Sequence, residues 1–525
     1  MNEKIMNRKK QPSNLFKTLN GNVFWGPAIL IVLVLIWGTA SPEGFSSIMN
    51  QALQFVLKYF NFFLVPVTFM AVVFCFWSAF SKYGNIRLGG EEAKPRMKTL
   101  TWFAISLCSG MGVGITYFAT YQPLQMFRNP PDFLKNSVLS NADAFTWAMR
   151  FSFLEWGFHP YALYTCVGVA TAFMFYNGKR RYRISDGLYP LLGEKVNGFA
   201  GDFVDAFSIF VIIAGLGASA GTAVMQIAQG SQYLFGVGNN LKGWFLILVI
   251  VALIYITGST TGLHAILSWL GNLNLGLYLA ILAFAMVCMN PSGILDIFWT
   301  SIGDYIQNFI GTSLYLEPIE TTGWIGNNNT FFFTWWMVFA PFSGLFLVKL
   351  AYGRTLREFV LVNMILPALF VLLWFSVFGG GAILMDIDSG GQIFALIEEM
   401  GPSMAWYALF EQLPFSGAAN FVAWIIVGIS FITLAESMTM SLASMSCKDY
   451  ADTNGETRPP RILCIFWGVI IAAVAYMLLY TGGRSSIETA VVVCGLPTGV
   501  LLMLMMISHI KAMKQQDKYD ESSSQ

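Results

Sequence analysis

A dense group of aromatic side chains lies in the stretch from Thr330 to Phe359. Its rings fall within nine positions: Phe331, Phe332, Phe333, Trp335, Trp336 and Phe339. On a helix, Trp335 and Phe339 share one face and Trp336 lies one step round. Such a row predicts an aromatic wall facing a cavity, although aromatic side chains of membrane helices also form interfacial belts or face lipid. Aromatic residues elsewhere in the chain must decide between these interpretations.

A second aromatic group, Trp156, Tyr161 and Tyr164, lies in the stretch EWGFHPYALY. Tyr161 and Tyr164 are one helical turn apart, and Trp156 precedes Tyr164 by two turns. An interfacial belt is again the simplest interpretation. A second group at helical spacing nevertheless favours a cavity lining that both groups share.

Two glycine-rich stretches mark places where a helix is weak. SGMGVG carries Gly110, Gly112 and Gly114, and AGLGASAG spans residues 214–221. Small residues form helix-packing faces, but closely spaced glycines also destabilise a helix. An unwound segment exposes carbonyl groups that coordinate a substrate or ion near the bilayer midplane. Breaks in corresponding positions indicate a secondary transporter built from inverted repeats.

The composition excludes several classes of protein. Of the 525 residues, 56% are hydrophobic and only 11% are charged, whereas a soluble domain carries about 25% charged residues. The net charge of +1 gives no electrostatic basis for binding nucleic acid. Seven scattered cysteines and three isolated histidines predict neither a disulfide framework nor a metal site. The sequence has no Walker A motif and no clustered catalytic residues, so we expect no ATP drive, no cofactor and no enzyme activity.

The elements that must position these residues are membrane-spanning helices. Runs of about 20 apolar residues predict an all-α chain with twelve spans, at 23–40, 52–80, 100–125, 144–176, 203–235, 243–258, 263–289, 330–351, 359–384, 415–446, 461–480 and 486–510. Lysine and arginine gather in the N-terminal tail, in the loops that follow even-numbered spans and in the C-terminal tail. This bias predicts that both termini are cytoplasmic.

Two long outer connections interrupt the series of spans. Residues 291–316 place apolar side chains at helical spacing opposite polar ones, which predicts an amphipathic helix for the membrane surface or a partner subunit. Residues 385–412 predict an outer loop with a short helix.

Four motifs taken together resemble the betaine/carnitine/choline transporter (BCCT) family. That family has a G-M-G-x-G break in its third span, an aromatic run that starts with W-G in its fourth, and a tryptophan-rich run in its eighth, followed by G-R-(S/T)-x-R-E. The matching residues here are 110–114, 156–164, 333–342 and 353–358. Each motif alone is weak, but the combination is specific and covers nearly the whole chain.

The resemblance implies a LeuT-type fold of two inverted five-helix repeats, and family members form trimers. The implied organisation is a cytoplasmic N-tail (1–22), two extra helices and a basic loop (23–98), a first repeat (99–290), an amphipathic surface helix with an outer loop (291–329), a second repeat (330–511) and a cytoplasmic C-tail (512–525).

The resemblance also implies what the aromatic residues do. Family substrates carry a quaternary or methylated onium group, which cannot be matched by a hydrogen-bond acceptor. Ring faces attract such a cation, each contributing about 0.5 to 2 kcal/mol when desolvated. Carried over residue by residue, the aromatic cage consists of Trp156, Tyr161, Tyr164, Trp335, Trp336 and Phe339, with Met111, Gly112 and Phe333 beside it.

Several positions depart from the family pattern. Phe333 and Phe339 stand where tryptophan is usual, which makes a substrate bulkier than glycine betaine plausible. Glu155 stands where histidine is usual, and Gln122 where glutamate is common. Glu155 is either a satisfied structural carboxylate or a membrane-buried acid that meets a cation or a proton.

The tenth span bears on the coupling ion. In sodium-coupled relatives the ion lies between the broken third span and a Thr-Ser pair, whereas this chain has Thr433 followed by Leu434. A leucine supplies no oxygen to sodium, so we expect sodium-independent exchange. Met111 follows the sodium-coupled pattern, and Glu155 leaves proton coupling open.

The sequence therefore predicts a secondary transporter of methylated ammonium compounds such as glycine betaine, carnitine, γ-butyrobetaine or choline. It is expected to be a homotrimer in the lipid bilayer of the inner (plasma) membrane. The alternatives are a sodium- or proton-coupled symporter of the same substrates and, more remotely, a channel. A channel would need a repeated polar or carbonyl-lined filter segment, and the chain has none.

Overall fold

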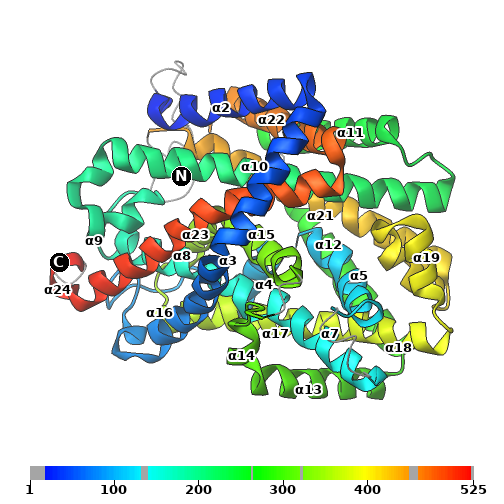
Figure 1. Cartoon of the computed structure of the whole chain (residues 1–525). Helices are drawn as coiled ribbons and strands as arrows, with labels where there is room; N and C mark the ends of the chain where they lie inside the picture. Colours follow the sequence, from blue (N-terminus) through cyan, green and yellow to red (C-terminus); the bar gives the residue numbers. More distant parts are fainter. Residues whose placement is uncertain are drawn as a thin grey trace, which may run out of the picture.

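The computed structural model describes residues 18–110, 112–131, 140–261, 264–319, 323–448 and 459–521 as an almost entirely helical bundle (Figure 1). No β-strand occurs among these residues; two isolated bridges, Leu19 with Cys447 and Arg87 with Thr355, join loops. The all-α prediction is therefore confirmed for this part of the chain. Ten of the helical segments described are long and apolar enough to cross a membrane, so the chain is a multi-pass membrane protein.

The ten segments contain the following helices: α2 (Gly21–Ala40), α3 (Pro42–Phe80), α10 (Phe199–Phe235), α11 (Leu241–Thr261), α12 (His264–Cys288), η4 (Gly326–Thr330) with α15 (Phe331–Leu350), α16 (Leu356–Val360) to α18 (Gly381–Asp388), α21 (Ser416–Met445), α22 (Arg461–Gly482) and α23 (Arg484–Lys514). Between α16 and α18 the segment continues through η5 (Leu361–Ile365), α17 (Leu366–Phe375) and η6 (Ser376–Gly380). The three elements η4, η5 and η6 are π-helical.

The third and fourth predicted spans are each made of two helices. The third consists of α4 (Thr99–Gly110) and α5 (Gly114–Arg128), which confirms the predicted break in the glycine-rich stretch. The fourth consists of α7 (Asn141–Trp156) and α8 (Phe158–Tyr176), separated at Gly157. Because these halves do not count as single long spans, the twelve-span topology stays a prediction.

The interpretation of residues 214–221 as a second break is wrong. Helix α10 runs through this stretch without interruption. Its glycines instead allow neighbouring helices to approach closely: a Cβ atom at Gly217 would lie 2.4 Å from Cγ1 of Val474, and one at Gly221 would lie 2.6 Å from Cδ1 of Ile487. Small residues here serve helix packing.

Helix α15 lies in the middle of the bundle (Figure 1), and 89% of the most apolar stretch of the segment Gly326–Leu350 is buried. It packs tightly against α8, since a Cβ atom at Gly344 would lie 2.5 Å from Cβ of Val167. The aromatic residues of α15 are therefore held inside the protein and do not form an interfacial belt.

The motif of residues 353–358 starts the helical segment that follows α15. Thr355 caps α16 by accepting a hydrogen bond from the backbone N–H of Glu358, whose carboxylate accepts one from the N–H of Thr355 in return. Gly353 adopts a φ of +75°, which suits glycine in the turn before the cap. Arg357 donates to the carbonyl of Ala79 at 3.1 Å, which ties α16 to the end of α3.

The two predicted outer helical regions are present. Residues 291–316 form α13 (Pro291–Gln307) and α14 (Phe309–Ser313), and α13 lies along one edge of the bundle (Figure 1). Its Ile294 and Tyr305 are buried, whereas Trp299 is 68% exposed. Residues 385–412 include α19 (Gln392–Met400), η7 (Pro402–Met404) and α20 (Ala405–Glu411).

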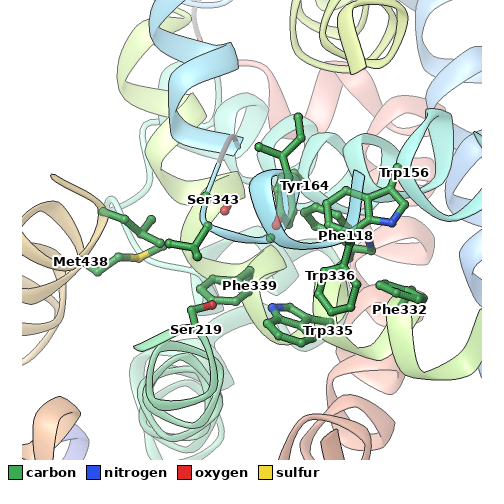
Figure 2. A pocket seen from close by; sticks show the side chains of 15 residues that line it. Phe118, Trp156, Tyr164, Ser219, Phe332, Trp335, Trp336, Phe339, Ser343 and Met438 are labelled. Carbon is green, nitrogen blue, oxygen red and sulfur yellow. The ribbon is translucent and has the colours of Figure 1, made fainter. Parts of the chain in front are cut away.

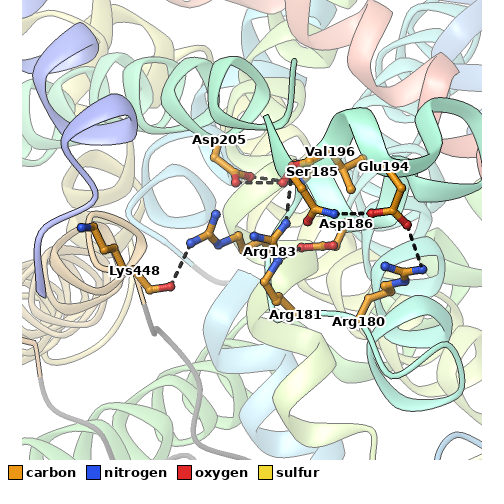
Figure 3. A network of polar contacts seen from close by, with 10 residues as sticks. Arg180, Arg181, Arg183, Ser185, Asp186, Glu194, Val196, Asp205 and Lys448 are labelled. Atoms are coloured by element: carbon orange, nitrogen blue, oxygen red, sulfur yellow. Dashed lines mark hydrogen bonds and ion pairs between the residues drawn. The ribbon is translucent and has the colours of Figure 1, made fainter. Parts of the chain in front are cut away.

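The remaining short helices belong to basic connections on one side of the bundle: η1 (Lys82–Asn85), η2 (Ser185–Leu188), α9 (Tyr189–Leu192), η3 (Gly193–Asn197) and α24 (Gln516–Tyr519). Figure 3 shows how polar contacts hold the connection that precedes α10. Arg181 pairs with the buried Asp186 at 3.1 Å, and Arg183 donates to the backbone carbonyl of Lys448 at 2.9 Å. The backbone N–H of Lys448 in turn donates to the carbonyl of Thr18. The N-terminal end of the described chain therefore contacts the same side as these loops.

Candidate functional site

The two aromatic groups meet at one cavity in the centre of the bundle (Figure 2). One face of α15 contributes a stripe of four side chains at helical spacing: Phe332, Trp336, Phe339 and Ser343. Helix α15 also contributes Trp335. Other elements add Trp156, Tyr164, Phe118, Ser219, Leu434 and Met438, together with residues 112–115. The cavity holds about 550 Å³ of space that no atom fills, measured out to its opening.

The rings of the cavity support one another mainly by edge-to-face contacts. Trp156 and Trp336 lie 5.0 Å apart at an interplanar angle of 87°, and Tyr164 lies 5.9 Å from Trp336. Phe118 contacts Trp335 at 5.8 Å, again edge to face. Such pairs contribute about 0.5 to 1.5 kcal/mol each beyond their buried area. The rings are therefore held in fixed orientations around the cavity.

Hydrogen bonds behind the cavity fix both tryptophans of the central pair. Trp336 donates its indole N–H to the backbone carbonyl of Glu155 at 2.9 Å, and Trp156 donates to Oε1 of Gln122 at 2.6 Å. Both indole N–H groups thus have acceptors outside the cavity, and the ring faces are free to contact a ligand.

The break between α4 and α5 lies in the wall of this cavity. Gly112, Val113, Gly114 and Ile115 all line it. The carbonyl of Val113 accepts from the backbone N–H and the hydroxyl of Thr116, so the first turn of α5 is closed by local bonds. The described lining contains no charged side chain. The cavity is thus an aromatic pocket with three hydroxyl groups and a stretch of irregular backbone.

A second, larger pocket lies beside the first. It holds about 1310 Å³ of empty space and is lined by residues of α4, α12, α15 and α21, including Thr101, Asn274, Tyr278, Phe346 and Ser437. The side chain of Leu434 lines both pockets and stands between them.

A family comparison identifies the chain. A model of the BCCT family, the betaine/carnitine/choline family of transporters, matches residues 22–518. The chain belongs to this family. Members of the BCCT family are transporters, so this chain is a membrane transporter and not an enzyme.

Individual relatives of this BCCT member differ in the substrates that they are named for. An osmo-independent choline transporter of Acinetobacter baylyi is 32% identical over 505 residues, which cover 95% of this chain and 94% of the relative. A glycine betaine transporter of Bacillus subtilis is 29% identical over 497 residues, with 94% of each chain covered. An ectoine/hydroxyectoine transporter of Virgibacillus pantothenticus is 28% identical over 508 residues, covering 97% of this chain and 99% of the relative.

The structure brings most of the predicted site residues of this BCCT member together. Those that line the aromatic cavity are Trp156, Tyr164, Trp335, Trp336, Phe339, Gly112 and Leu434. Tyr161 and Phe333 are buried but outside the lining, and Phe333 stacks on the ring of His159 at 5.4 Å. Thr433 lines only the second pocket. Glu155 lies behind the cavity with its side chain fully buried, and Met111 lies outside the described residues.

Eight lining residues were not predicted as site residues from the sequence, among them Ser343 and residues 113–115 of the break. Phe332 is four positions before Trp336, so the helical period of α15 could have identified it. Phe118 is one turn after Gly114, where the break turns α5 towards the cavity. Ser219 and Met438 come from α10 and α21, and no local sequence signal marks them.

Proposed function

We propose that this BCCT member is a secondary transporter that binds the quaternary or methylated ammonium group of its substrate in the aromatic cavity. One observation carries the proposal: indole and phenyl rings from three helices surround a space whose described lining carries no charged side chain. Ring faces attract such a cation at about 0.5 to 2 kcal/mol each when water is excluded. In this proposal the cage comprises Trp156, Tyr164, Trp335, Trp336 and Phe339, while Tyr161 and Phe333 support it from behind.

The rest of the substrate is proposed to lie towards the break between α4 and α5. The lining there includes Gly112 of the break, and the hydroxyl groups of Ser343 and Ser219 also face the cavity. Helix breaks of this kind contribute main-chain groups that bind polar parts of a substrate. A small polar tail such as a hydroxyl or carboxyl group therefore fits the candidate substrates, which are choline, glycine betaine, carnitine and γ-butyrobetaine.

The second pocket is proposed to be the passage from the cavity to the cytoplasm. It is bounded by α4, which begins directly after the basic loop at residues 81–98. Basic loops mark the cytoplasmic side, and both termini are assigned to that side for the same reason. Transport would then occur by alternating access, with Leu434 separating the substrate from the passage. We assign the protein to the cell inner membrane.

Two properties of the assembly are part of the proposal. Residues 99–290 and 330–511 would form the two inverted five-helix repeats of a LeuT-type fold, with the break between α4 and α5 at the start of the first repeat. The protein would form a homotrimer, and the exposed Trp299 of α13 supplies an apolar contact for a neighbouring subunit.

The proposed transport mode is sodium-independent exchange of one substrate molecule for another. Thr433 donates its hydroxyl hydrogen to the carbonyls of Ile429 and Ser430, and the next residue, Leu434, offers no oxygen. Sodium requires several oxygen ligands, and this pair supplies few. Symport with sodium or protons is the alternative, and Glu155 is the residue through which protons would act.

Two experiments test this function. Thermal shift of the purified protein against choline, glycine betaine, carnitine, γ-butyrobetaine and ectoine should identify at least one stabilising onium compound. That compound should then drive counterflow in proteoliposomes in which potassium replaces sodium. If counterflow collapses without sodium, and a sodium gradient alone restores uptake into vesicles with no internal substrate, the exchange mode is wrong. Conductance far above transporter turnover would indicate a channel.

A further inference from the structure

A buried acid lies behind the aromatic cavity and is joined to it by one amide. Trp156 donates its indole N–H to Oε1 of Gln122 at 2.6 Å, and Nε2 of Gln122 donates to Oε2 of Glu155. An indole nitrogen can only donate a hydrogen bond. Trp156 therefore fixes which end of the Gln122 amide faces it, and the amide nitrogen is turned towards Glu155.

A second link joins Glu155 to the same cavity. Its backbone carbonyl accepts the indole N–H of Trp336 at 2.9 Å. Trp156 and Trp336, which stand side by side in the cavity wall (Figure 2), are thus both held by this one residue, the former through Gln122. The carboxyl group of Glu155 is consequently among the nearest groups to the cavity that can carry a charge.

The protein supplies no positive charge to this acid within the part that the structure describes. Glu155 is 0% exposed, and its Oε1 atom has no hydrogen-bond partner. The two arginines closest to the pair along α5 and α7 bind other acids. Arg128 pairs with Asp386, and Arg150 pairs with Asp304 at 2.6 Å.

The histidine one turn after Glu155 does not serve as its partner either. His159 stacks on Phe333, and neither of its ring nitrogens forms a hydrogen bond. An unpaired carboxylate inside a membrane protein is costly, and such residues usually meet a cation or a proton. Both hydrogen-bond links from Glu155 lead to the wall of the aromatic cavity, where a cation can arrive.

We propose that Glu155 is the counter-charge of the cavity and selects onium compounds with a net positive charge over zwitterions. This inference rests on the proposed function, since it needs the onium group to occupy the cavity. A cation such as choline gains the full attraction of the buried acid. A zwitterion such as glycine betaine gains attraction at its ammonium group and loses it by repulsion at its carboxylate. Gln122 is a positioning residue in this scheme, because it holds both the acid and the Trp156 ring.

The test compares choline and glycine betaine, which share the trimethylammonium group and differ in net charge. A unit charge about 10 Å from the bound cation, at an effective dielectric constant of about 20, changes affinity on the order of tenfold. Equilibrium binding to the purified full-length protein is measured for the wild type and for Glu155→Gln. The glutamine keeps an oxygen that accepts the Gln122 amide N–H, and it removes the charge. Choline binding should weaken about tenfold, and glycine betaine binding should change less than twofold.

A matched control is Glu436→Gln. Glu436 is another buried glutamate, on α21 and outside the cavity lining, and it contacts Ser437. This variant should leave the ratio of the two affinities at the wild-type value. Glu155→Ala, which also removes the acceptor for Gln122, should weaken both compounds because Trp156 loses its support.

Two results would overturn the inference while leaving the proposed function intact. One is a Glu155→Gln variant in which both affinities stay at the wild-type value or fall by the same factor, since a merely structural role predicts that pattern. The other is equal affinity of the wild-type protein for the two compounds. This measurement does not require the variant to fold. A wild type that binds no onium compound at all would instead refute the proposed function.

Discussion

The replacement of Trp336 by alanine tests the cage at its most connected ring. Trp336 is 9% exposed, lines the cavity, and contacts Trp156 at 5.0 Å and Tyr164 at 5.9 Å. Alanine removes one cation–π contact, worth up to about 2 kcal/mol, and the support that keeps Trp156 in place, worth about 1 kcal/mol. A loss of about 2 to 3 kcal/mol corresponds to substrate binding weakened roughly 30-fold to 150-fold. Trp336→Phe keeps a ring face and should lose less than tenfold.

Isothermal titration of purified variants with the stabilising onium compound measures this loss. A large-to-small change in the core costs about 3 to 5 kcal/mol of stability, so each variant is first checked for a monodisperse elution profile and a cooperative melting transition. Trp299→Ala is the control, because Trp299 is 68% exposed on α13 and is not part of the lining. Binding within twofold of wild type for both Trp336→Ala and Trp335→Ala would refute the cage.

Three further predictions concern packing, passage and pH. Gly344→Ala should lower the melting temperature, because its Cβ would lie 2.5 Å from Cβ of Val167 and overpacking costs about 1 to 3 kcal/mol. The control Gly428→Ala should leave the melting temperature unchanged, because its Cβ would have no atom within 4 Å. Equal melting temperatures for the two variants would contradict the close packing of α8 against α15. Ser437→Trp, in the lining of the second pocket alone, should leave substrate binding within twofold and slow counterflow at least tenfold; unchanged counterflow would show that substrate does not pass there. Burial raises the pKa of the Asp186 carboxyl group from its ordinary value, and the nearby Arg181 opposes this shift. The folded state therefore holds the carboxyl proton more tightly than the unfolded state, so the stability of the fold falls as pH rises through the folded-state pKa. Asp186→Asn should therefore melt no lower than wild type at pH 7 and show a shallower fall in melting temperature from acidic to neutral pH, and a steeper fall would contradict the burial argument.

The break in the third span could be predicted from the sequence, but its absence from the fifth could not. Both stretches are rich in glycine, and both are weak as isolated helices. In α10 the neighbours decide: Val474 and Ile487 fill the space that a side chain would occupy at Gly217 and Gly221, so the glycines serve packing and the helix stays intact. Local propensity cannot show which neighbours will be present.

The residues that line the cavity could likewise be predicted from the sequence only in part. The helical period of α15 predicts Trp335 and Phe339 on one face with Trp336 one step round, and the structure has all three in the lining. The orientation of α8 about its own axis is set by packing against α15, and it turns Tyr164 to the cavity and leaves Tyr161 out of the lining. The bond between Gln122 and Glu155 joins residues 33 positions apart. In the sequence, Gln122 and Glu155 were two separate departures from the family pattern. Their contact depends on how α5 packs against α7.

The most direct test of the central claim, that the cavity recognises a positive charge through ring faces, is binding of choline against its neutral carbon analogue, 3,3-dimethylbutan-1-ol. The two molecules share their shape and hydroxyl group and differ only in the charge at the central atom. Competition of each against the stabilising onium compound, on the wild-type protein at constant ionic strength, gives the two affinities. The account predicts that the neutral analogue binds at least thirtyfold more weakly than choline, as expected when several rings each contribute about 0.5 kcal/mol or more. Equal affinities would contradict it, because the cavity would then recognise only shape and apolar surface.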